Sequence, residues 1–373
     1  MKVAITGGHG FLGWHTSCRL RSTRGIEPVR LNRAEYTDGT LFSAVGEADI
    51  VIHVAGVNRA DSDTAVEAGN VELARLLADC IEKSGRAIHV VYANSIQAKL
   101  DNPYGRGKAA AAEILRTATD SNGGTMSDVL LPNLFGEHGR PGYNSFVATF
   151  ASDVAQGGSP TVTGDREIEL LHAQRAAEVL IRAAEERIDG PVEPRGVPRR
   201  IAKVLSMLVS FNELYASGEI PDLTDSFALD LFNTYRSYLR TDHFPIHPQI
   251  HADPRGELFE TARTHGGTGQ AFVSITVPGA MRGDHYHLNK VERFFVVKGE
   301  AEIKLRRLLH DEVLTYRLSG DQPGFVDMPT MWVHNIKNVG EGELITMFWA
   351  DQLLDPVNPD QFPEKVTAEE ATR

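Results

Sequence analysis

The sequence predicts an α/β domain with a doubly wound parallel sheet, followed by an all-β barrel domain. Over the first 120 residues short apolar runs alternate with helical patterns, and a glycine-rich turn follows the first run. After Asp242 only strand-sized runs separated by turn residues occur. Strands that alternate with helices form βαβ units and a parallel sheet covered on both faces. Short strands without room for long helices are typical of a sandwich or barrel.

Chain length and the change in secondary-structure pattern along the chain indicate two domains. The 373 residues are roughly two to three times the usual domain size. We expect domains at 1–243 and 244–373. A stretch rich in Pro and His, His243–Glu257, separates the part with alternating strand and helix patterns from the part with strand patterns alone. The last residues, Pro363–Arg373, are charged and aperiodic, which predicts a frayed tail.

The predicted elements follow from these runs. In the first domain the strands are Lys2–Thr6, Val29–Leu31, Asp49–Ala55 and Ile88–Asn94, and the helices include Phe11–Arg21 and Asn70–Lys83. In the second domain the strands include Phe272–Val277, Arg293–Val297, Ala301–Leu305, Thr315–Leu318, Gly324–Met328 and Leu344–Trp349.

The charge balance limits the classes of partner. There are 38 basic and 50 acidic side chains, so the net charge of −12 disfavours binding to nucleic acid or an anionic membrane. No apolar run approaches the roughly 20 residues that span a bilayer, and no signal peptide pattern opens the chain. We therefore expect a cytoplasmic protein without membrane insertion. Cys18 and Cys80 are expected to be buried thiols rather than a disulfide or metal pair.

The glycine-rich run Thr6–Gly13 follows the apolar strand Val3–Ile5 and opens a helix. Glycines at this spacing permit a tight turn, let backbone N–H groups approach a pyrophosphate and pack the helix close to the strand. The positive end of the helix then faces the phosphates. The run predicts a dinucleotide site, and the alternative is a glycine-rich turn that binds nothing.

The residues after the second strand indicate the cofactor. Proteins that bind NAD carry an acidic side chain there, which bonds the ribose 2′-hydroxyl. Here Asn32 and Arg33 follow Val29–Leu31, with no carboxylate at that place. Because arginine pairs bidentately with a 2′-phosphate, the sequence favours NADP(H). The alternative is that Arg33 is a solvated loop residue.

Three residues have the chemistry of carbonyl reduction. If a helix begins near Pro103, Tyr104 and Lys108 lie on one of its faces. The Lys108 ammonium is expected to lower the phenol pKa from about 10, so that Tyr104 can protonate a developing alkoxide. Ser95 would give the same oxygen a second hydrogen bond. The alternative is a solvated helix face.

Four potential metal ligands occur in the second domain. His285, His287 and Glu292 fall within eight residues, and His334 follows. Residues two apart on a strand point to the same side, here into a barrel. Such N/O ligands suit a divalent metal such as Zn²⁺ with a position left open. The alternatives are a chance grouping of histidines and a metal with a purely structural role.

The first domain resembles the extended short-chain dehydrogenase/reductase family, which has a Rossmann-type sheet and acts mostly on nucleotide sugars. The matching positions are Thr6–Gly13, His53–Gly56, Asn70, Ser95, Tyr104, Lys108 and Pro132–Gly136. The resemblance implies cofactor contacts by Thr6, Gly7, Gly10, Phe11, Leu12, Gly13, Asn32, Arg33, Ala55, Gly56, Asn70 and Lys108.

Some positions depart from that family. The arginine that usually precedes Pro132 is absent from Val129–Leu131, and paired aspartates of a later turn are replaced in His172–Arg175. Ile96 and Gln97 follow the serine, where a dehydratase needs an acidic pair. These residues favour ketone reduction, oxidation or C4 epimerisation over dehydration.

The second domain resembles the cupin barrels. The pattern Gly279-x5-His285-x-His287-x4-Glu292-x6-Gly299 matches the first cupin motif, and Pro329–Asn338 matches the second, with Met331 where glycine is usual. Asp253–Gly256 and Arg282–Tyr286 resemble segments of deoxysugar 3,5-epimerases, which remove a proton next to a 4-keto group. Tyr286 is only a weak candidate for the base, because it points away from the ligands on a regular strand.

A reductase domain followed by a cupin domain resembles the bifunctional capsular-polysaccharide enzymes of the CapF type. Further matching strings are His53–Arg59, Ser95–Ala98, Asp101–Gly105 and Tyr143–Ser145. In that family the cupin domain epimerises C3 of a UDP-2-acetamido-2,6-dideoxy-4-hexulose. The first domain then reduces C4 with NADPH to a UDP-2-acetamido-2,6-dideoxy-L-talose, on the route to UDP-N-acetyl-L-fucosamine.

The resemblance also implies substrate contacts by Asn133, Tyr143 and Asn144, and a homodimer. Two alternatives to this bifunctional enzyme are open. One is a simple NADP-dependent nucleotide-sugar reductase or C4 epimerase with a cupin for dimerisation or substrate capture. The other is an NADP(H)-binding sensor, against which the intact Ser95, Tyr104 and Lys108 argue.

Overall fold

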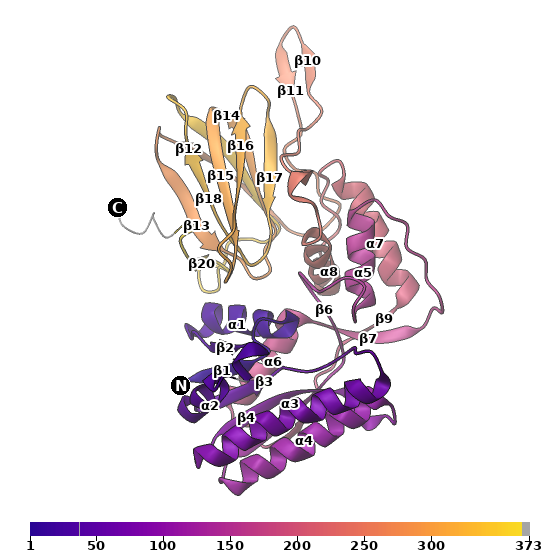
Figure 1. Cartoon of the computed structure of the whole chain (residues 1–373). Coiled ribbons are helices and arrows are strands. Elements are labelled where there is room, and N and C mark those ends of the chain that lie inside the picture. Colours follow the sequence, from indigo (N-terminus) through magenta and orange to yellow (C-terminus); the bar gives the residue numbers. More distant parts are fainter. Residues whose placement is uncertain (37, 368–373) are drawn as a thin grey trace. The chain divides into compact units, whose positions relative to one another are not determined.

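The chain forms two compact units in a computed structural model that describes residues 1–36 and 38–367. Unit 1 comprises Met1–Thr149 and Arg166–Ile201. Unit 2 comprises Phe150–Asp165 and the chain from Ala202 onward. Figure 1 labels the elements of both units. None of the described helices is long and apolar enough to cross a membrane.

Unit 1 is built on a six-stranded sheet with the order β2-β1-β3-β4-β5-β8, in which every pair is parallel. The strands are β1 (Val3–Thr6), β2 (Val29–Leu31), β3 (Ile50–His53), β4 (His89–Ser95), β5 (Thr125–Leu131) and β8 (Gly190–Val192). The strand order reverses between β1 and β3, which is where open parallel sheets bind ligands. The predicted doubly wound sheet is confirmed.

Helices cover both faces of this sheet (Figure 1). They are α1 (Phe11–Arg24), α2 (Thr40–Glu47), α3 (Asp63–Ser84), α4 (Pro103–Ser121) and α6 (Ala173–Glu185). One buried cluster joins α3 and α4 to Val51 and Val90, and another joins α1 and α6 to the alternate strand residues Ile52 and Val91. Alternate residues of a strand face opposite sides, so each cluster fills one face.

Local capping explains one difference from the predicted helices. The helix expected at Asn70–Lys83 begins at Asp63, because the side chain of Ser62 accepts the N–H of Ala65. On the helices of unit 1, Cys18 is a buried free thiol and Cys80 is a partly buried one.

A smaller sheet and short turns complete the elements before Ala202. The sheet has the order β6-β7-β9. Its strands are β6 (Asn133–Phe135), β7 (Glu167–His172) and β9 (Val197–Arg200), and the 3₁₀ turns are η1 (Ala34–Tyr36) and η2 (Ile96–Lys99). Helix α5 (Phe146–Ala155) precedes β7 in the chain.

Unit 2 contains two antiparallel sheets that pack as a barrel, as predicted. One has the order β12-β19-β14-β17 and the other β16-β15-β18-β13-β20. The strands are β12 (Gln270–Thr276), β13 (Met281–Tyr286), β14 (Glu292–Lys298), β15 (Glu300–Arg307), β16 (Val313–Ser319), β17 (Gly324–Met328), β18 (Trp332–Asn338), β19 (Leu344–Ala350) and β20 (Phe362–Pro363). A separate hairpin joins β10 (His251–Asp253) to β11 (Gly256–Leu258).

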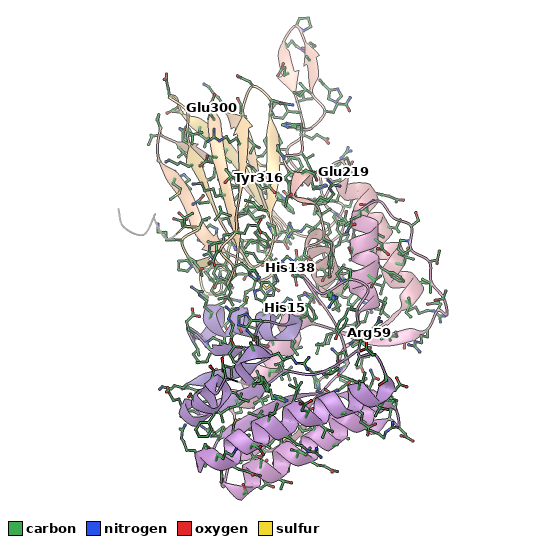
Figure 2. All side chains as sticks on the ribbon, viewed as in Figure 1. His15, Arg59, His138, Glu219, Glu300 and Tyr316 are labelled. Carbon is green, nitrogen blue, oxygen red and sulfur yellow. The ribbon has the colours of Figure 1, made fainter. Side chains whose placement is uncertain are left out.

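An apolar cluster fills part of the barrel interior. Side chains fill the space between its strands (Figure 2), and the buried cluster there includes Phe294, Ile303, Ile336 and Phe348. These residues come from strands of both sheets. Burial of this surface holds the two sheets face to face.

Unit 2 also includes helices that precede the predicted boundary at 243. These are α7 (Ile201–Tyr215), α8 (Ser226–Arg236) and the turn η3 (Thr241–His243). Arg293 of the barrel forms a buried ion pair with Asp327 at 2.7 Å, and Tyr215 of α7 donates a hydrogen bond to the same carboxylate at 2.6 Å. Composition changes near 243, but these contacts join α7 to the barrel. The compact unit therefore extends further toward the N-terminus than the predicted domain.

The prediction of a frayed tail is wrong for the residues that the structure describes. Strand β20 pairs with β13, Lys365 Nζ lies 2.8 Å from Asp284 Oδ2, and Glu364 accepts from Arg306 at 2.6 Å. The charges of Glu364 and Lys365 are therefore paired with charges on the barrel. Residues 368–373 lie outside the described part.

Candidate functional site

A cleft of about 770 Å³ lies in unit 1 at the carboxyl ends of the parallel strands. It is lined by most of the residues expected to bind cofactor or substrate or to act on them: Gly7, Gly10, Phe11, Leu12, Asn32, Arg33, Ala55, Gly56, Ser95, Tyr104, Lys108, Asn133, Tyr143 and Asn144. Carboxyl ends of parallel strands meet at one edge of a sheet, so residues far apart in sequence line one cleft.

The glycine loop brings the backbone close to neighbouring segments. Gly7 has φ of 70°, and a Cβ there would lie 2.8 Å from the backbone N of Ala55. A Cβ on Gly13, in the first turn of α1, would collide with the carbonyl oxygen of Gly7. Helix α1 begins after Gly10, which has no side chain to cap the first N–H groups. These N–H groups suit a phosphate.

Three residues expected to contact cofactor support the cleft from outside its lining. Gly13 permits the close approach of α1, and Thr6 Oγ1 is hydrogen bonded to His53 Nδ1 at 2.6 Å. Asn70 donates to the carbonyl of Val57 at 2.7 Å and accepts its N–H at 3.1 Å. Asn70 thus holds the loop after β3 in place.

The end of β2 carries a carboxylate that sequence reasoning missed. Glu35 accepts the backbone N–H of Asn32 at 2.7 Å and its side-chain amide at 3.1 Å. The Glu35 side chain is therefore bonded to the turn, while Asn32 and the exposed Arg33 line the cleft. In the sequence, Glu35 could have been found from its position in the turn after β2, two residues beyond Arg33.

Helix α4 begins at Pro103, as predicted, and Asn102 caps it by accepting the N–H of Gly105 at 2.8 Å. The turn carries Tyr104 and Lys108 into the cleft with Ser95. Lys108 is only 3% exposed. Its Nζ donates to the carbonyl of Ala93 at 2.7 Å and lies 4.1 Å from the centre of the Tyr92 ring.

Burial controls the protonation of this group set. Burial lowers the pKa of Lys108 to about 7. Burial also raises the pKa of Tyr104 to about 12, and the hydrogen bond with Ser95 only partly opposes this. The expectation that Lys108 lowers the phenol pKa is therefore wrong in this structure, because removal of the phenol from water outweighs nearby groups.

His53, at the end of β3, is a buried neutral histidine close enough to Lys108 to be affected by its charge. Burial lowers the pKa of His53 to about 3, and the charge of Lys108 acts in the same direction. The His53 ring stacks on Tyr92 with 5.6 Å between ring centres. His53 therefore contributes packing and a hydrogen bond to Thr6 rather than a charge.

The positions where the family has paired aspartates hold a buried polar cluster instead. His172 lies 3.0 Å from Glu137 Oε2, and Gln174 Nε2 lies 2.8 Å from His15 Nδ1. Burial opposes ionisation of Glu137, but His172 outweighs it and the pKa of Glu137 falls to about 2. The only sequence signal for Glu137 was its place directly after the Pro132–Gly136 motif.

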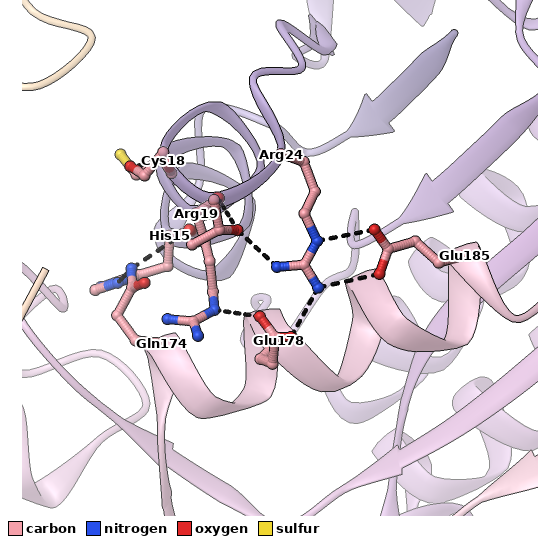
Figure 3. A network of polar contacts seen from close by, with 9 residues as sticks. His15, Cys18, Arg19, Arg24, Gln174, Glu178 and Glu185 are labelled. Carbon is pink, nitrogen blue, oxygen red and sulfur yellow. Dashed lines mark hydrogen bonds and ion pairs between the residues drawn. The ribbon is translucent and has the colours of Figure 1, made fainter. Parts of the chain in front are cut away.

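Ion pairs extend this contact between α1 and α6 (Figure 3). Glu178 accepts from Arg19 at 2.6 Å and from Arg24 at 2.9 Å, and Glu185 accepts from Arg24 at 2.8 Å. Gln174, in the segment that replaces the aspartates, thus belongs to a contact between α1 and α6, and His172 makes no side-chain cap at the start of α6.

The four predicted metal ligands meet inside the barrel of unit 2. One ligand atom from each of His285, His287, Glu292 and His334 lies within 4.8 Å of the others. His285 lies on β13, His287 directly after it, Glu292 at the start of β14 and His334 on β18. Antiparallel pairing of β13 with β18 places His285 opposite His334.

The donor set fits a divalent metal. Glu292 Oε2 lies 3.8, 3.1 and 3.3 Å from the Nε2 atoms of His285, His287 and His334. The Nε2 atoms of His285 and His334 are buried and form no well-aligned hydrogen bond with a described residue. Burial opposes ionisation of Glu292, but the three histidines hold its pKa well below the usual value. Burial lowers the pKa of His334 to about 4.

Backbone carbonyls orient these ligands. His334 Nδ1 lies 3.0 Å from the carbonyl of Trp332. A carbonyl only accepts, so Nδ1 carries the hydrogen and the lone pair of Nε2 faces Glu292. Met331 has φ of 60°, which explains why glycine is usual there, and its N–H donates to the carbonyl of His287 at 2.7 Å.

A pocket of about 420 Å³ opens beside the ligands. Its lining includes His285, Glu292, Arg282, Gln361 and aromatic rings of Phe272, Phe294 and Phe348. Arg282 Nε donates to Thr276 Oγ1 at 3.0 Å. Tyr286 is buried against Phe362 and is not part of this lining, which agrees with its weak candidacy as a base.

Comparisons with known proteins cover both units. Residues 3–193 match the NAD dependent epimerase/dehydratase family, and residues 251–362 match the polysaccharide biosynthesis C-terminal domain. The chain is 32% identical to the Pseudomonas aeruginosa protein UDP-2-acetamido-2,6-beta-L-arabino-hexul-4-ose reductase, over 97% of this chain and 98% of that one. The Bacillus subtilis spore coat polysaccharide biosynthesis protein SpsL is 28% identical over 120 residues, which are 30% of this chain and 80% of SpsL.

A solved structure is similar over almost the whole chain. The capsular polysaccharide assembling protein CapF from Staphylococcus aureus has a TM-score of 0.64 and 32% identity, and the match covers 98% of this chain and 100% of CapF. Together with the two family matches, this shows that the chain belongs to the CapF family, in which an NAD-dependent epimerase/dehydratase domain precedes a polysaccharide biosynthesis C-terminal domain.

Proposed function

We propose that this protein is a bifunctional nucleotide-sugar enzyme of capsular polysaccharide biosynthesis. The barrel epimerises C3 of a UDP-2-acetamido-2,6-dideoxy-4-hexulose, and unit 1 reduces C4 with NADPH to a UDP-2-acetamido-2,6-dideoxy-L-talose, toward UDP-N-acetyl-L-fucosamine. The observation that carries the proposal is that one chain holds both sets of residues. Ser95, Tyr104 and Lys108 line the cleft of unit 1, and four potential metal ligands converge in the barrel. The Pseudomonas relative is named as a reductase of a closely related hexulose.

The reduction uses Tyr104, Ser95 and Lys108. Bound NADPH supplies the hydride to C4. Tyr104 gives its phenol proton to the developing alkoxide, and Ser95 donates a second hydrogen bond to that oxygen. Because burial keeps the pKa of Tyr104 near 12, the phenol is protonated at neutral pH and ready to donate. Lys108 adds a buried cation whose attraction for negative charge is weakly screened.

NADP(H) is the proposed cofactor because of the groups at the end of β2. Arg33 lines the cleft and is exposed, so its guanidinium can meet a 2′-phosphate. The nearby Glu35 carboxylate is bonded to Asn32 and is not part of the cleft lining, so it does not occupy the place of an NAD-binding acid.

Substrate binding is assigned to residues further along the cleft. Asn133, Tyr143 and Asn144 line it, as does Arg140, whose guanidinium lies 5.1 Å from the centre of the Tyr143 ring. Arg140 supplies a cation for the diphosphate, and it replaces the arginine that is absent before Pro132. Sequence reasoning missed Arg140, although it follows the Pro132–Gly136 motif by four positions.

The epimerisation is assigned to the barrel pocket. A divalent metal, proposed to be Zn²⁺, held by His285, His287, Glu292 and His334 would supply Lewis acidity that favours the enolate of a 4-keto sugar. The aromatic walls of the pocket exclude water from one side of the sugar, and Arg282 provides a polar contact. The ligand set, rather than Tyr286, therefore defines the reacting end of the pocket.

A homodimer is part of the proposal, and an apolar edge strand supports it. Strand β12 lies at the end of its sheet, and Val273, Ile275 and Val277 on it or beside it are more than half exposed, Val273 at 65%. Exposed apolar edge strands pair readily with another chain. Sedimentation of the full-length protein measures its mass directly.

The first prediction concerns the proton donor. Tyr104→Phe keeps the ring but removes the acid, so turnover with NADPH and a UDP-4-keto sugar should fall by roughly 10² to 10⁴. The affinity for NADPH should change little. Tyr316→Phe, in the barrel, is the matched control and should react as the unmodified protein does. Near-normal NADPH oxidation by Tyr104→Phe would remove this residue from the mechanism.

The second prediction is a pH dependence set by Lys108. Because its pKa is about 7 in the folded protein, its ammonium is lost as the pH rises through that value. The kcat/KM for reduction should therefore fall above about pH 7. In Lys108→Arg the side chain stays charged well above pH 7, so the fall in kcat/KM should move to higher pH. A fall that stays at the same pH in Lys108→Arg would contradict the assignment.

The third prediction concerns Arg33. A charge-assisted contact with the 2′-phosphate is worth about 1.5–3 kcal/mol, so Arg33→Ala should narrow the preference for NADPH over NADH by roughly 10- to 100-fold. Initial rates with both cofactors measure this. Arg75→Ala, on the exposed side of α3, is the control. Equal use of the two cofactors by the unmodified protein would show the assignment to be wrong.

The fourth prediction concerns the barrel. Full-length Tyr104→Phe, given a UDP-4-keto-6-deoxy sugar in D₂O without NADPH, should incorporate deuterium at C3, which mass spectrometry detects. Adding His287→Ala should abolish metal binding and this exchange, while NADPH binding is kept. His251→Ala, on the exposed hairpin, is the control.

Two other outcomes of that experiment have clear meanings. Exchange that persists after metal removal would leave the metal with a structural role. No exchange in the presence of intact ligands would favour a simple reductase or C4 epimerase whose barrel serves binding or dimerisation.

A further inference from the structure

The segment between β19 and β20 reaches the candidate metal centre. Asp360, in this segment, lies next to the loop that joins His287 to Glu292. Its side-chain Oδ1 accepts the N–H of Leu288 at 2.9 Å, and Oδ2 accepts the N–H groups of Asn289 and Lys290, each at 2.9 Å. One carboxylate therefore holds three consecutive N–H groups of the ligand loop.

The backbone of the same residue contacts a metal ligand directly. The carbonyl oxygen of Asp360 lies 2.5 Å from His287 Nδ1. Asp360 has φ of 43°, a left-handed backbone conformation that residues other than glycine adopt rarely. Lys290 Nζ donates to the carbonyl of the preceding residue, Pro359, at 2.7 Å. The segment and the ligand loop are thus tied by both backbone and side-chain contacts.

These contacts decide the hydrogen position on His287. A carbonyl oxygen only accepts hydrogen bonds, so Nδ1 must donate and neutral His287 has its lone pair on Nε2. That lone pair faces Glu292 Oε2 at 3.1 Å, and His334 is oriented in the same way by Trp332. Lone pairs that converge on a carboxylate repel one another unless a cation lies between them.

We propose that Asp360 is a positioning residue of the metal centre. Its carbonyl fixes the tautomer and direction of His287, and its carboxylate holds the loop whose length sets the separation of His287 from Glu292. The inference rests on the metal site of the proposed function and extends it to a residue outside both cupin motifs. A metal on Nε2 would make Nδ1–H a stronger donor, so metal binding should also strengthen the attachment of the C-terminal segment.

Metal affinity of the full-length protein tests this role. Asp360→Ala keeps the backbone carbonyl that contacts His287 but removes the carboxylate that holds this carbonyl and the ligand loop in register. We expect it to weaken Zn²⁺ binding by about 10- to 100-fold in competition with a chromophoric chelator, the range found when outer-shell contacts are lost in other metal sites. Asp360→Asn keeps an acceptor oxygen and should lose less. Asp355→Ala is the matched control, because its carboxylate accepts the N–H of Val357 in an exposed turn away from the ligand loop.

Two further measurements separate positioning from general stability. The visible absorption of bound Co²⁺ reports ligand geometry and should change in Asp360→Ala but not in Asp355→Ala. The melting temperature of the metal-free proteins shows how far each variant loses stability without the ion. NADPH binding confirms that unit 1 is folded. If Asp360→Ala does not fold, the affinity and spectrum of Asp360→Asn decide the question.

Three results would overturn the proposal. One is unchanged Zn²⁺ affinity and Co²⁺ absorption in the Asp360 variants. Another is a lower melting temperature of the metal-free variant with unchanged affinity, which would make Asp360 merely structural. The third is that the unmodified protein binds no metal, so that its Zn²⁺ affinity in the chelator competition equals that of His287→Ala. Only this third result would remove the metal centre itself, so the two failures are distinguishable.

Discussion

Parallel pairing of β1, β3 and β4 is the constraint on which the candidate site of unit 1 depends. Because the three strands end at one edge, the glycine loop, the loop after β3 and Ser95 meet there although they are far apart in the sequence. The collision that a Cβ on Gly13 would have with Gly7 shows how little space separates helix from loop. The same edge buries Lys108 against β4, which gives this amine a pKa near neutrality.

The barrel unit depends on polar contacts that are fully buried. Arg293 pairs with Asp327 and stacks on Phe325, and the same carboxylate accepts from Tyr215. Breaking such a pair leaves an unpaired charge in the interior, which is far more costly than the loss of an exposed ion pair. The pair therefore fixes α7 against the strands. Two of the candidate metal ligands are also buried with one ring nitrogen paired, since backbone carbonyls accept hydrogen bonds from Nδ1 of His287 and His334.

The two sites combine apolar walls with a few oriented polar groups. In the cleft, burial raises the pKa of the Tyr104 phenol and lowers that of the Lys108 amine, because burial disfavours the charged form of each group. In the barrel, the histidines around Glu292 outweigh its burial and keep it ionised. The first arrangement suits proton donation to a carbonyl oxygen, and the second suits a cation.

The sequence by itself determined the parallel sheet, the barrel, most of the expected residues of the cleft and the four side chains that converge in the barrel. These follow from local rules, because glycine spacing, alternation along a strand and the i, i+4 spacing of Tyr104 and Lys108 each act within a few residues. Only the tertiary structure decided the pKa of Tyr104, the attachment of α7 to the barrel, and the contacts of Glu35, Arg140 and Asp360. Burial and contacts between distant segments set these features, and neither leaves a local pattern in the chain.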